Sequence, residues 1–287
     1  MDGPSDKNIT VTSGEWEVRT VLAVDKIRQC IYYTSTEVHS TESHVYNVSY
    51  ATMEKHALTD ISKPGFWSAK FSPARGWYTL RYAGPGDPHS ASCSINSSEP
   101  TRVGASQLTV QPPKAIDMPT IEYFEIELVP DTNYTLNVQA QYPPGFDPSK
   151  KYQVLFNSYG GPSSQDVTKQ LQLDPFRTYI SSDPELQYII YVVDPRGTGY
   201  KGRAFRSTVA GQLGLFDAHD QIWAADHLIA KNSFIDSNHV AIWGSSYGGY
   251  LAAKVIESQG SHTGPFTLGL SASPVTDWDL YHAEYER

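Results

Sequence analysis

The sequence has no run of about 18 apolar residues, the length that a helix needs to cross a bilayer. Its opening, MDGPSDKNIT, also lacks the apolar core of a secretory signal. Positive charge is scarce: 22 Lys and Arg against 31 Asp and Glu give a net charge of −9, which argues against a nucleic-acid-binding protein. No Cys and His cluster has metal-ligand spacing, so we expect no metal and no cofactor.

Cysteine is nearly absent as well, with Cys30 and Cys93 as the two examples. Two separate buried thiols are the simpler interpretation, and a single disulfide stays open. N-glycosylation sequons, in contrast, recur in the first half of the chain, at Asn8, Asn47, Asn96 and Asn133. They favour a glycoprotein from a secreted or lumenal parent. Because the chain carries no leader, this interpretation predicts that it is a piece of a longer protein.

Apolar residues make up 39% of the chain and aromatic residues 12%, with 21 Gly and 19 Pro, which suits a folded, turn-rich protein. The first half contains short β-patterns separated by turns. These predicted strands cover residues 16–21, 30–35, 44–50, 67–71 and 77–82. Their spacing is typical of four-stranded propeller blades or of a sandwich. They amount to roughly two blades, too few to close a propeller ring of about 4–8 blades.

The second half changes to alternating strands and helices. We predict buried strands at 152–156, 188–193, 240–243 and 266–270, and helices at 217–230 and 249–257. This order predicts a doubly wound, mostly parallel sheet. A Pro-rich stretch with a strand-like segment at 121–126 joins the two halves. The predicted domains are therefore 1–110 (partial propeller), 111–150 (connecting segment) and 151–287 (partial α/β domain).

Residues 244–248, GSSYG, fit the pattern G-x-S-x-G. They follow a predicted strand and open a predicted helix, which is the context of a nucleophile elbow. The glycines allow a tight, strained turn that exposes the Ser246 hydroxyl, and the Tyr247 N–H can stabilise an oxyanion at the helix N-terminus. Ser245 occupies the x position and is the weaker candidate. The alternative is a glycine-rich structural turn.

Two loops follow other predicted strands. Residues 157–162, NSYGGP, could place the Tyr159 hydroxyl at the oxyanion site, and an ordinary turn with a surface tyrosine is equally compatible with the residues. Residues 194–200, DPRGTGY, lack the GK[ST] of a phosphate loop. A structural turn with Arg196 in an ion pair is the favoured interpretation.

The end of the chain carries an aromatic stripe. Trp278, Tyr281 and Tyr285 are spaced by three and four residues and would share one face of a helix. Such a stripe usually belongs to a core. Its position after the strand next to Ser246 also allows a flat apolar substrate pocket.

Several stretches together resemble the prolyl oligopeptidase superfamily of serine peptidases, most closely the dipeptidyl peptidase IV branch and its fungal members. They are 14–18 (GEWEV), 80–88 (LRYAGPGDP), 142–147 (YPPGFD), 159–162 (YGGP), 194–200 (DPRGTGY), 220–222 (DQI), 241–250 (AIWGSSYGGY) and 274–278 (PVTDW). The resemblance implies an α/β-hydrolase fold preceded by the last strands of a β-propeller, and a parent that is secreted or membrane-anchored and can form a homodimer.

The resemblance also assigns roles. Ser246 would be the nucleophile, and the Tyr247 N–H with the Tyr159 hydroxyl would form the oxyanion hole. The pocket for proline or alanine at the second position of a peptide substrate would be lined by Tyr247, Val275, Trp278, Tyr281 and Tyr285. The reaction would release an N-terminal dipeptide by acyl transfer through the serine.

The chain departs from this family in one respect. The fold supplies its catalytic residues in the order Ser, Asp, His, and only a short stretch follows Ser246. The candidates in it, Asp277, Asp279, His262 and His282, are poor matches. We therefore expect a chain that is truncated at both ends and inactive on its own. The alternatives are a non-catalytic binding relative, a prolyl endopeptidase or acylaminoacyl peptidase, and an ordinary lipase or esterase.

Overall fold

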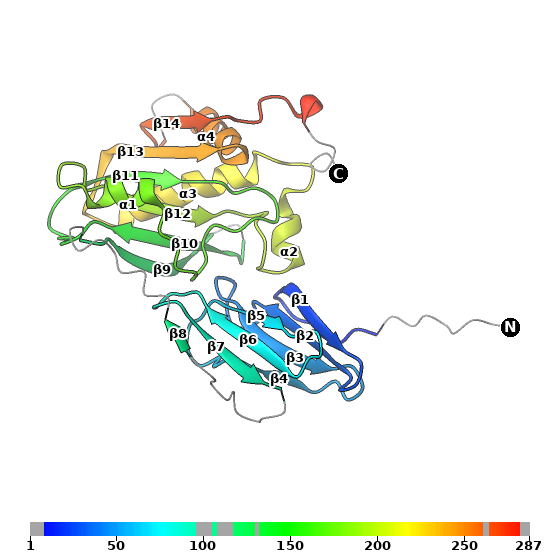
Figure 1. The fold of residues 1–287 in the computed structure, drawn as a ribbon. Helices are drawn as coiled ribbons and strands as arrows, with labels where there is room; N and C mark the ends of the chain where they lie inside the picture. The colour runs from blue at the N-terminus through cyan, green and yellow to red at the C-terminus, as the bar shows by residue number, and fades with distance from the viewer. Residues whose placement is uncertain (1–8, 96–104, 108–116, 130–131, 261–263, 282–287) are drawn as a thin grey trace. The chain divides into compact units, whose positions relative to one another are not determined.

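The computed structural model describes residues 9–95, 105–107, 117–129, 132–260 and 264–281. The chain forms two compact units (Figure 1). The β unit comprises Met1–Thr109 together with Lys169–Leu171, and the α/β unit comprises Val110–Thr168 together with Gln172–Arg287. Each unit has hydrophobic clusters of its own and is described separately.

The β unit contains two antiparallel four-stranded sheets, each with its strands in sequence order. The first is formed by β1 (Val18–Asp25), β2 (Cys30–Ser35), β3 (His44–Ser49) and β4 (Lys55–Ala57). The second is formed by β5 (Trp67–Phe71), β6 (Trp77–Tyr82), β7 (His89–Ser94) and β8 (Ala105–Gln107). This is the blade-like arrangement predicted from the strand spacing. β6 alternates exposed and buried residues, as a strand with one covered face does.

The α/β unit is built on a six-stranded sheet in the order β14-β13-β11-β12-β10-β9. Four neighbouring strands run parallel: β11 (Tyr152–Asn157), β12 (Ile189–Asp194), β13 (Ile235–Ser245) and β14 (Leu268–Ala272). The antiparallel strands are β9 (Thr120–Glu127) and β10 (Thr135–Tyr142), so the sheet is mixed. Both come from the segment expected to be a connection, which therefore contributes to the main sheet.

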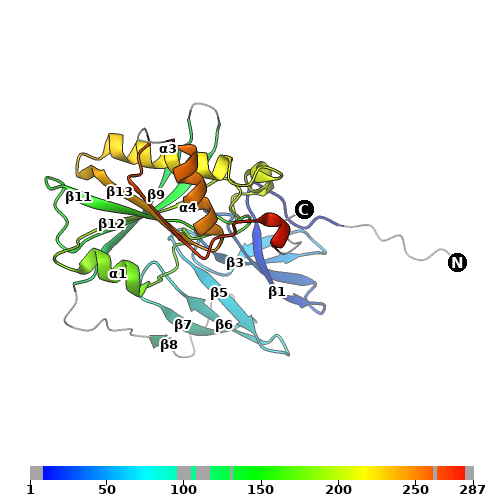
Figure 2. The ribbon, with the colours of Figure 1, turned by 90° about the horizontal axis from the view of Figure 1, so that it is seen from above.

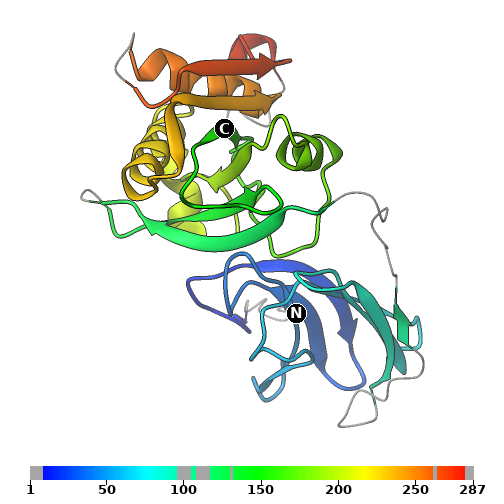
Figure 3. The ribbon, with the colours of Figure 1, turned by 90° about the vertical axis from the view of Figure 1, so that its left-hand side faces the viewer.

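Helices cover both faces of this sheet, as a doubly wound fold requires. α3 (Phe216–Lys231) and α4 (Tyr247–Ser258) pack on one face, where Leu228 and Leu251 meet Phe156 of β11. α1 (Pro175–Ser182) covers the other face, where Ile180 meets Leu155. Figures 2 and 3 show α3 and α1 on opposite sides of the strands. A short α2 (Arg203–Arg206) and a 3₁₀ turn η1 (Ser207–Val209) precede α3.

Candidate active site

Ser246 lies between the end of β13 and the start of α4, at the turn predicted from the sequence. Its backbone has φ 58° and ψ −122°, a conformation that residues with a side chain rarely adopt. The Ser246 N–H donates to Ala272 O over 2.9 Å, and the N–H groups of Gly249 and Tyr250 donate to Ser246 O. The strained turn is therefore fixed by β14 on one side and by the first turn of α4 on the other.

The two outer glycines of the pattern are required by close backbone contacts. A Cβ at Gly244 would lie 2.2 Å from Gly248 O and 2.5 Å from Ser158 O. A Cβ at Gly248 would lie 2.1 Å from Ser158 O. No side chain can be accommodated at these separations without moving the backbone of β13, α4 or the loop after β11.

Tyr159 lies in that loop, directly beside the turn. The Ser158 N–H donates to Trp243 O over 2.8 Å, which continues the pairing of β11 with β13. The Tyr159 ring then lies with its centroid 6.2 Å from that of Tyr247. Gly160 holds the loop close, since a Cβ there would lie 2.6 Å from a methyl group of Leu251. The sheet therefore brings Tyr159 and Ser246 to the same edge, as the sequence predicted.

The side chain of Tyr247 is buried beneath the turn, with 2% of its surface exposed. Its hydroxyl donates to Asp217 Oδ2 over 2.7 Å. Its ring centroid lies 5.5 Å from that of Tyr250 and 6.1 Å from that of Trp278. A cluster of aromatic rings thus lies next to Ser246.

The end of the chain differs from the expected helical stripe. Residues Trp278–Leu280 form one 3₁₀ turn, η2, capped by the Asp277 side chain, which accepts from the Asp279 N–H. Trp278 packs edge-on to Tyr250, and Tyr281, 39% exposed, packs edge-on to Trp278. The expectation of a continuous helix through these rings is wrong for the described residues. The turn ends at Tyr281, whose backbone is extended (φ −99°, ψ 170°), so the helical conformation does not continue beyond Leu280.

The other predicted site residues divide into two groups. Val275 is buried in the segment between β14 and η2. Tyr285, His262 and His282 lie outside the described residues, so the structure does not test the positions predicted for them. The role assigned to each side chain remains a prediction.

A small polar cavity of about 210 Å³ opens beside Tyr159 and was missed by the sequence analysis. Its lining residues are Asn157, Ser158, Tyr159, Asp166, Gln172, Arg177, Trp243 and Ser245. Burial raises the pKa of Asp166, and the positive charge of Arg177, which lowers it, only partly offsets this effect. Among the described residues, Ser158 Oγ and Arg177 Nε have no hydrogen-bond partner. These residues are distant in sequence from the G-x-S-x-G pattern, and no local signal marks them.

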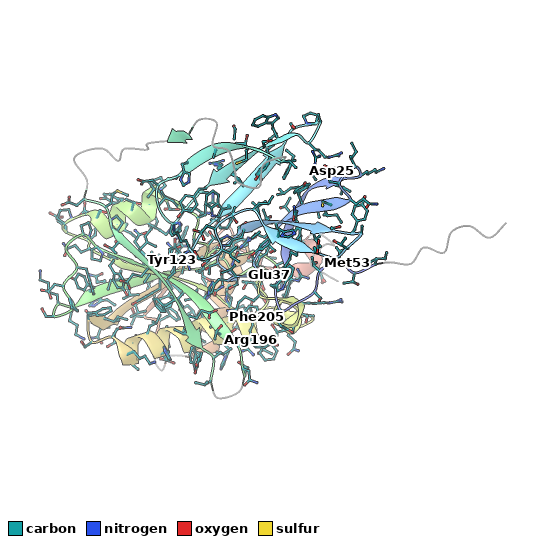
Figure 4. All side chains as sticks on the ribbon, turned by 90° about the horizontal axis from the view of Figure 1, so that it is seen from below. Asp25, Glu37, Met53, Tyr123, Arg196 and Phe205 are labelled. Carbon is teal, nitrogen blue, oxygen red and sulfur yellow. The ribbon has the colours of Figure 1, made fainter. Side chains whose placement is uncertain are left out.

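The turn after β12 is structural, as predicted. Arg196 binds Asp220 of α3 through its guanidinium, with Nη2 2.6 Å from Oδ1, and its backbone N–H donates to the same carboxylate. Figure 4 shows Arg196 close to Phe205, whose carbonyl oxygen accepts from the Gly197 N–H. Asp194, at the end of the same strand, accepts the N–H groups of Asp166 and Val167.

The remaining expectations concern the surface and the thiols. Cys30 and Cys93 are both free thiols, which confirms that they are separate; Cys93 is buried as expected, but Cys30 is only half-buried, so the expectation of two buried thiols is wrong for Cys30. Asn133 is exposed and Asn47 is half-buried on β3, whereas Asn8 and Asn96 lie outside the described residues. Within the part of the chain that the structure describes, no group of three or more His, Cys, Asp or Glu could hold a metal ion. No helix in that part is long and apolar enough to cross a membrane.

A mixed sheet with helices on both faces and a strained serine between a parallel strand and a helix defines an α/β-hydrolase fold. Comparison with protein families agrees. Residues 172–287 match the prolyl oligopeptidase family, and residues 1–89 match the dipeptidyl peptidase IV N-terminal region, the β-propeller part of those proteins. The chain belongs to the prolyl oligopeptidase family of serine peptidases, in its dipeptidyl peptidase IV branch.

Individual relatives point the same way. The chain is 47% identical to a probable dipeptidyl peptidase 4 of Emericella nidulans and 49% identical to one of Aspergillus fumigatus, each over 96% of this chain. It covers 35% and 36% of those proteins, so it spans about a third of the length of the curated relatives. Among solved structures, the dipeptidyl peptidase 4 of Porphyromonas gingivalis is 30% identical, with a TM-score of 0.82 over 96% of this chain and 37% of that one.

Proposed function

We propose that the chain carries the nucleophile and part of the substrate pocket of a serine dipeptidyl peptidase. The observation that carries the proposal is the backbone of Ser246, which keeps a positive φ at the end of a buried parallel strand. Such strain persists only where the surrounding structure enforces it, and it clusters at active sites. Gly244 and Gly248 enforce it here, since neither tolerates a Cβ.

The chemistry follows from the position of each group. Ser246 Oγ attacks the carbonyl carbon of the peptide bond after the second residue, and its proton passes through a histidine base to the leaving amine. The carbonyl oxygen becomes an oxyanion that accepts from the Tyr247 N–H and the Tyr159 hydroxyl. The C–N bond then breaks, which leaves a dipeptidyl ester on Ser246. Water hydrolyses this ester and releases the dipeptide.

The rings beside Ser246 account for the proposed preference at the second position. Tyr247 and Trp278 lie in ring contact, and Tyr281 adjoins Trp278. We assign Val275 and Tyr285 to the same pocket. Aromatic walls suit the flat, apolar pyrrolidine of proline and also admit the methyl group of alanine. We extend the proposal to a secreted or membrane-anchored parent that can form a homodimer, with N-glycans at Asn8, Asn47, Asn96 and Asn133.

The decisive experiment assays the full-length gene product on a Gly-Pro chromogenic amide. Ser246→Ala is expected to lower kcat by about 10³-fold or more, because no other group can form the ester. Ser245→Ala, the adjacent serine, is the matched control and should leave turnover largely intact. An unchanged rate in Ser246→Ala would refute the assignment. A wild-type protein that binds Gly-Pro peptides without turnover would instead support the non-catalytic alternative.

We further propose that the 287-residue polypeptide has no such activity by itself. Asp277 caps η2 through its carboxylate and is therefore committed to a structural role. The resemblance provides no catalytic role for Asp279, His262 or His282. Without a base the serine hydroxyl is a weak nucleophile. Turnover by this polypeptide that vanishes in Ser246→Ala would contradict the proposal and reveal a base within it.

A further inference from the structure

The carboxyl group of Asp217 lies under the proposed active site and has no part in the chemistry described so far. Asp217 stands in the first turn of α3 and is fully buried. Its Oδ2 accepts the hydroxyl of Tyr247 over 2.7 Å, across 30 positions of sequence. The chain thus joins an acidic side chain on α3 to the residue that directly follows the proposed nucleophile.

Backbone groups hold this carboxyl group in place. Its Oδ1 accepts the Ala218 N–H over 3.1 Å, and further backbone hydrogen bonds come from Gly214 and from Asp217 itself. The start of α3 also favours negative charge through the helix dipole. Burial nevertheless raises the pKa of Asp217. Because these hydrogen bonds fix the position of the Asp217 carboxyl group, they also fix the position of the Tyr247 hydroxyl that donates to it.

A second tyrosine hydroxyl joins the same two segments. Tyr250, one turn further along α4, donates to Leu213 O over 2.9 Å. Gly214 lets the hydroxyl approach, because a Cβ there would lie 2.2 Å from the Tyr250 oxygen. The loop before α3 and the first turn of α3 are therefore each bonded to the first turn of α4, through Tyr250 and Tyr247, whose ring centroids lie 5.5 Å apart.

We propose that Asp217 is a positioning residue for the active site, acting through the Tyr247 hydroxyl. Tyr247 contributes two things to the proposed function on which this inference rests: its N–H faces the oxyanion and its ring forms a wall of the proline pocket. The hydrogen bond from the Tyr247 hydroxyl to Asp217 holds both the N–H and the ring in position. Loss of the bond lets the ring turn and tilts the first peptide unit of α4.

Proline should sense this change more strongly than alanine. A pyrrolidine fills the pocket and contacts the ring, whereas a methyl group leaves space for a displaced ring. Asp217 therefore sets the preference for proline over alanine as well as the rate. A residue that merely stabilised the fold would lower the amount of active protein and leave this preference unchanged.

The test compares Asp217→Ala and Asp217→Asn in the full-length gene product, with Asp226→Ala as the control. Asp226 is an exposed carboxylate on the same helix. In Asp217→Ala, kcat/KM for a Gly-Pro amide should fall about 10²-fold, the usual effect of a misplacement near 1 Å, and should fall less for a Gly-Ala amide. Asp217→Asn keeps an acceptor oxygen and should retain rate and preference within a few-fold. Asp226→Ala should match the wild type.

A double-mutant cycle guards against trivial loss of folding. Tyr247→Phe removes the hydroxyl and keeps the ring, so it should show the same loss of proline preference, and Asp217→Ala should add little to it. If Asp217→Ala does not fold, Tyr247→Phe alone decides. A folded Asp217→Ala or Tyr247→Phe with unchanged preference overturns the inference while leaving the proposed function intact. Absence of wild-type turnover overturns both.

Discussion

In the β unit a buried carboxylate is matched by positive charge, whereas in the α/β unit another is matched by backbone N–H groups. Glu42 lies 2.7 Å from Lys169 Nζ and 2.9 Å from His44 Nε2. Burial raises its pKa, but the hydrogen bonds and charges of these two partners outweigh burial and hold the pKa below its usual value. For Asp194, burial and the nearby Asp166 charge prevail over the bonds from the backbone and raise the pKa to about 7.

These two carboxyl groups therefore make the stability of their units depend on pH in opposite directions. Glu42 stabilises the β unit above its unfolded pKa, near 4.5, and this contribution is lost as the pH falls through its lowered folded pKa. Asp194 binds its proton more tightly in the folded state. It therefore favours folding at low pH, and the α/β unit loses this stability as the pH rises from about 4 to about 7.

The largest expected effect comes from breaking the buried Arg196–Asp220 ion pair of the α/β unit. Arg196→Met removes the partner of Asp220, which is fully buried. The free energy of unfolding should fall by about 3–5 kcal/mol at pH 7, because an unpaired buried charge remains. Urea unfolding followed by hydrogen exchange in α3 measures this. A loss below about 1 kcal/mol would mean that backbone N–H groups alone stabilise the Asp220 carboxylate. The α/β unit would then differ from the β unit more sharply in how it stabilises buried carboxylates.

Glu42→Gln tests the β unit. The substitution keeps the shape and removes the charge that faces Lys169 and His44. We expect the unit to lose about 1.5–3 kcal/mol at pH 7, the range for hydrogen bonds to charged groups. The loss should be smaller at acidic pH than at pH 7, because Glu42 itself becomes protonated once the pH falls through its lowered folded pKa. Hydrogen exchange in β2 and β3 provides the measurement, and an equal loss at both pH values would break the comparison.

Asp194→Asn tests the predicted loss of stability of the α/β unit with rising pH. With no ionisable group at this position, stability of the α/β unit should decline less between pH 4 and pH 7 than in the wild type. Each unit of raised pKa accounts for about 1.4 kcal/mol of that decline. The comparison requires unfolding free energies across this range for both proteins, from exchange in β12. A decline of the same size in Asp194→Asn would mean that another group causes it.

The smallest effect is expected on the surface. Lys254 and Glu257 form an exposed pair on α4, with Nζ 2.7 Å from Oε2. Lys254→Met should change the free energy of unfolding by less than about 0.5 kcal/mol, and less still in high salt. A shift comparable with that of Arg196→Met in the same unfolding experiment would show that burial does not explain the difference between the pairs.

Much of the fold could be predicted because some segments carry their pattern within themselves. β12 is buried at every residue and reads as a continuous apolar run, Ile-Ile-Tyr-Val-Val. β7 was missed because His-Ser-Ala-Ser-Cys-Ser has little strand propensity, and its pairing with β6 determines it instead. β4, with three exposed residues, offers no pattern at all.

The site divides in the same way. The serine, its glycines and Tyr159 follow strand ends that meet at one edge of the sheet, so local patterns locate them. Asp217 and Asp166 reach the site by packing between distant segments, and their sequence neighbours give no sign of it. The single turn at Trp278 was not predicted, because the extended backbone of Tyr281 ends it although the rings have helical spacing.

The backbone of Ser246 has one further consequence, for thermal stability. At φ 58° and ψ −122° every side chain is strained by about 1–3 kcal/mol, and glycine escapes this cost. A glycine at position 246 should therefore melt at a higher temperature than an alanine there, although both lack the hydroxyl. The protein retains a less stable residue at this turn, so a search for heat-resistant variants will tend to select against the nucleophile itself.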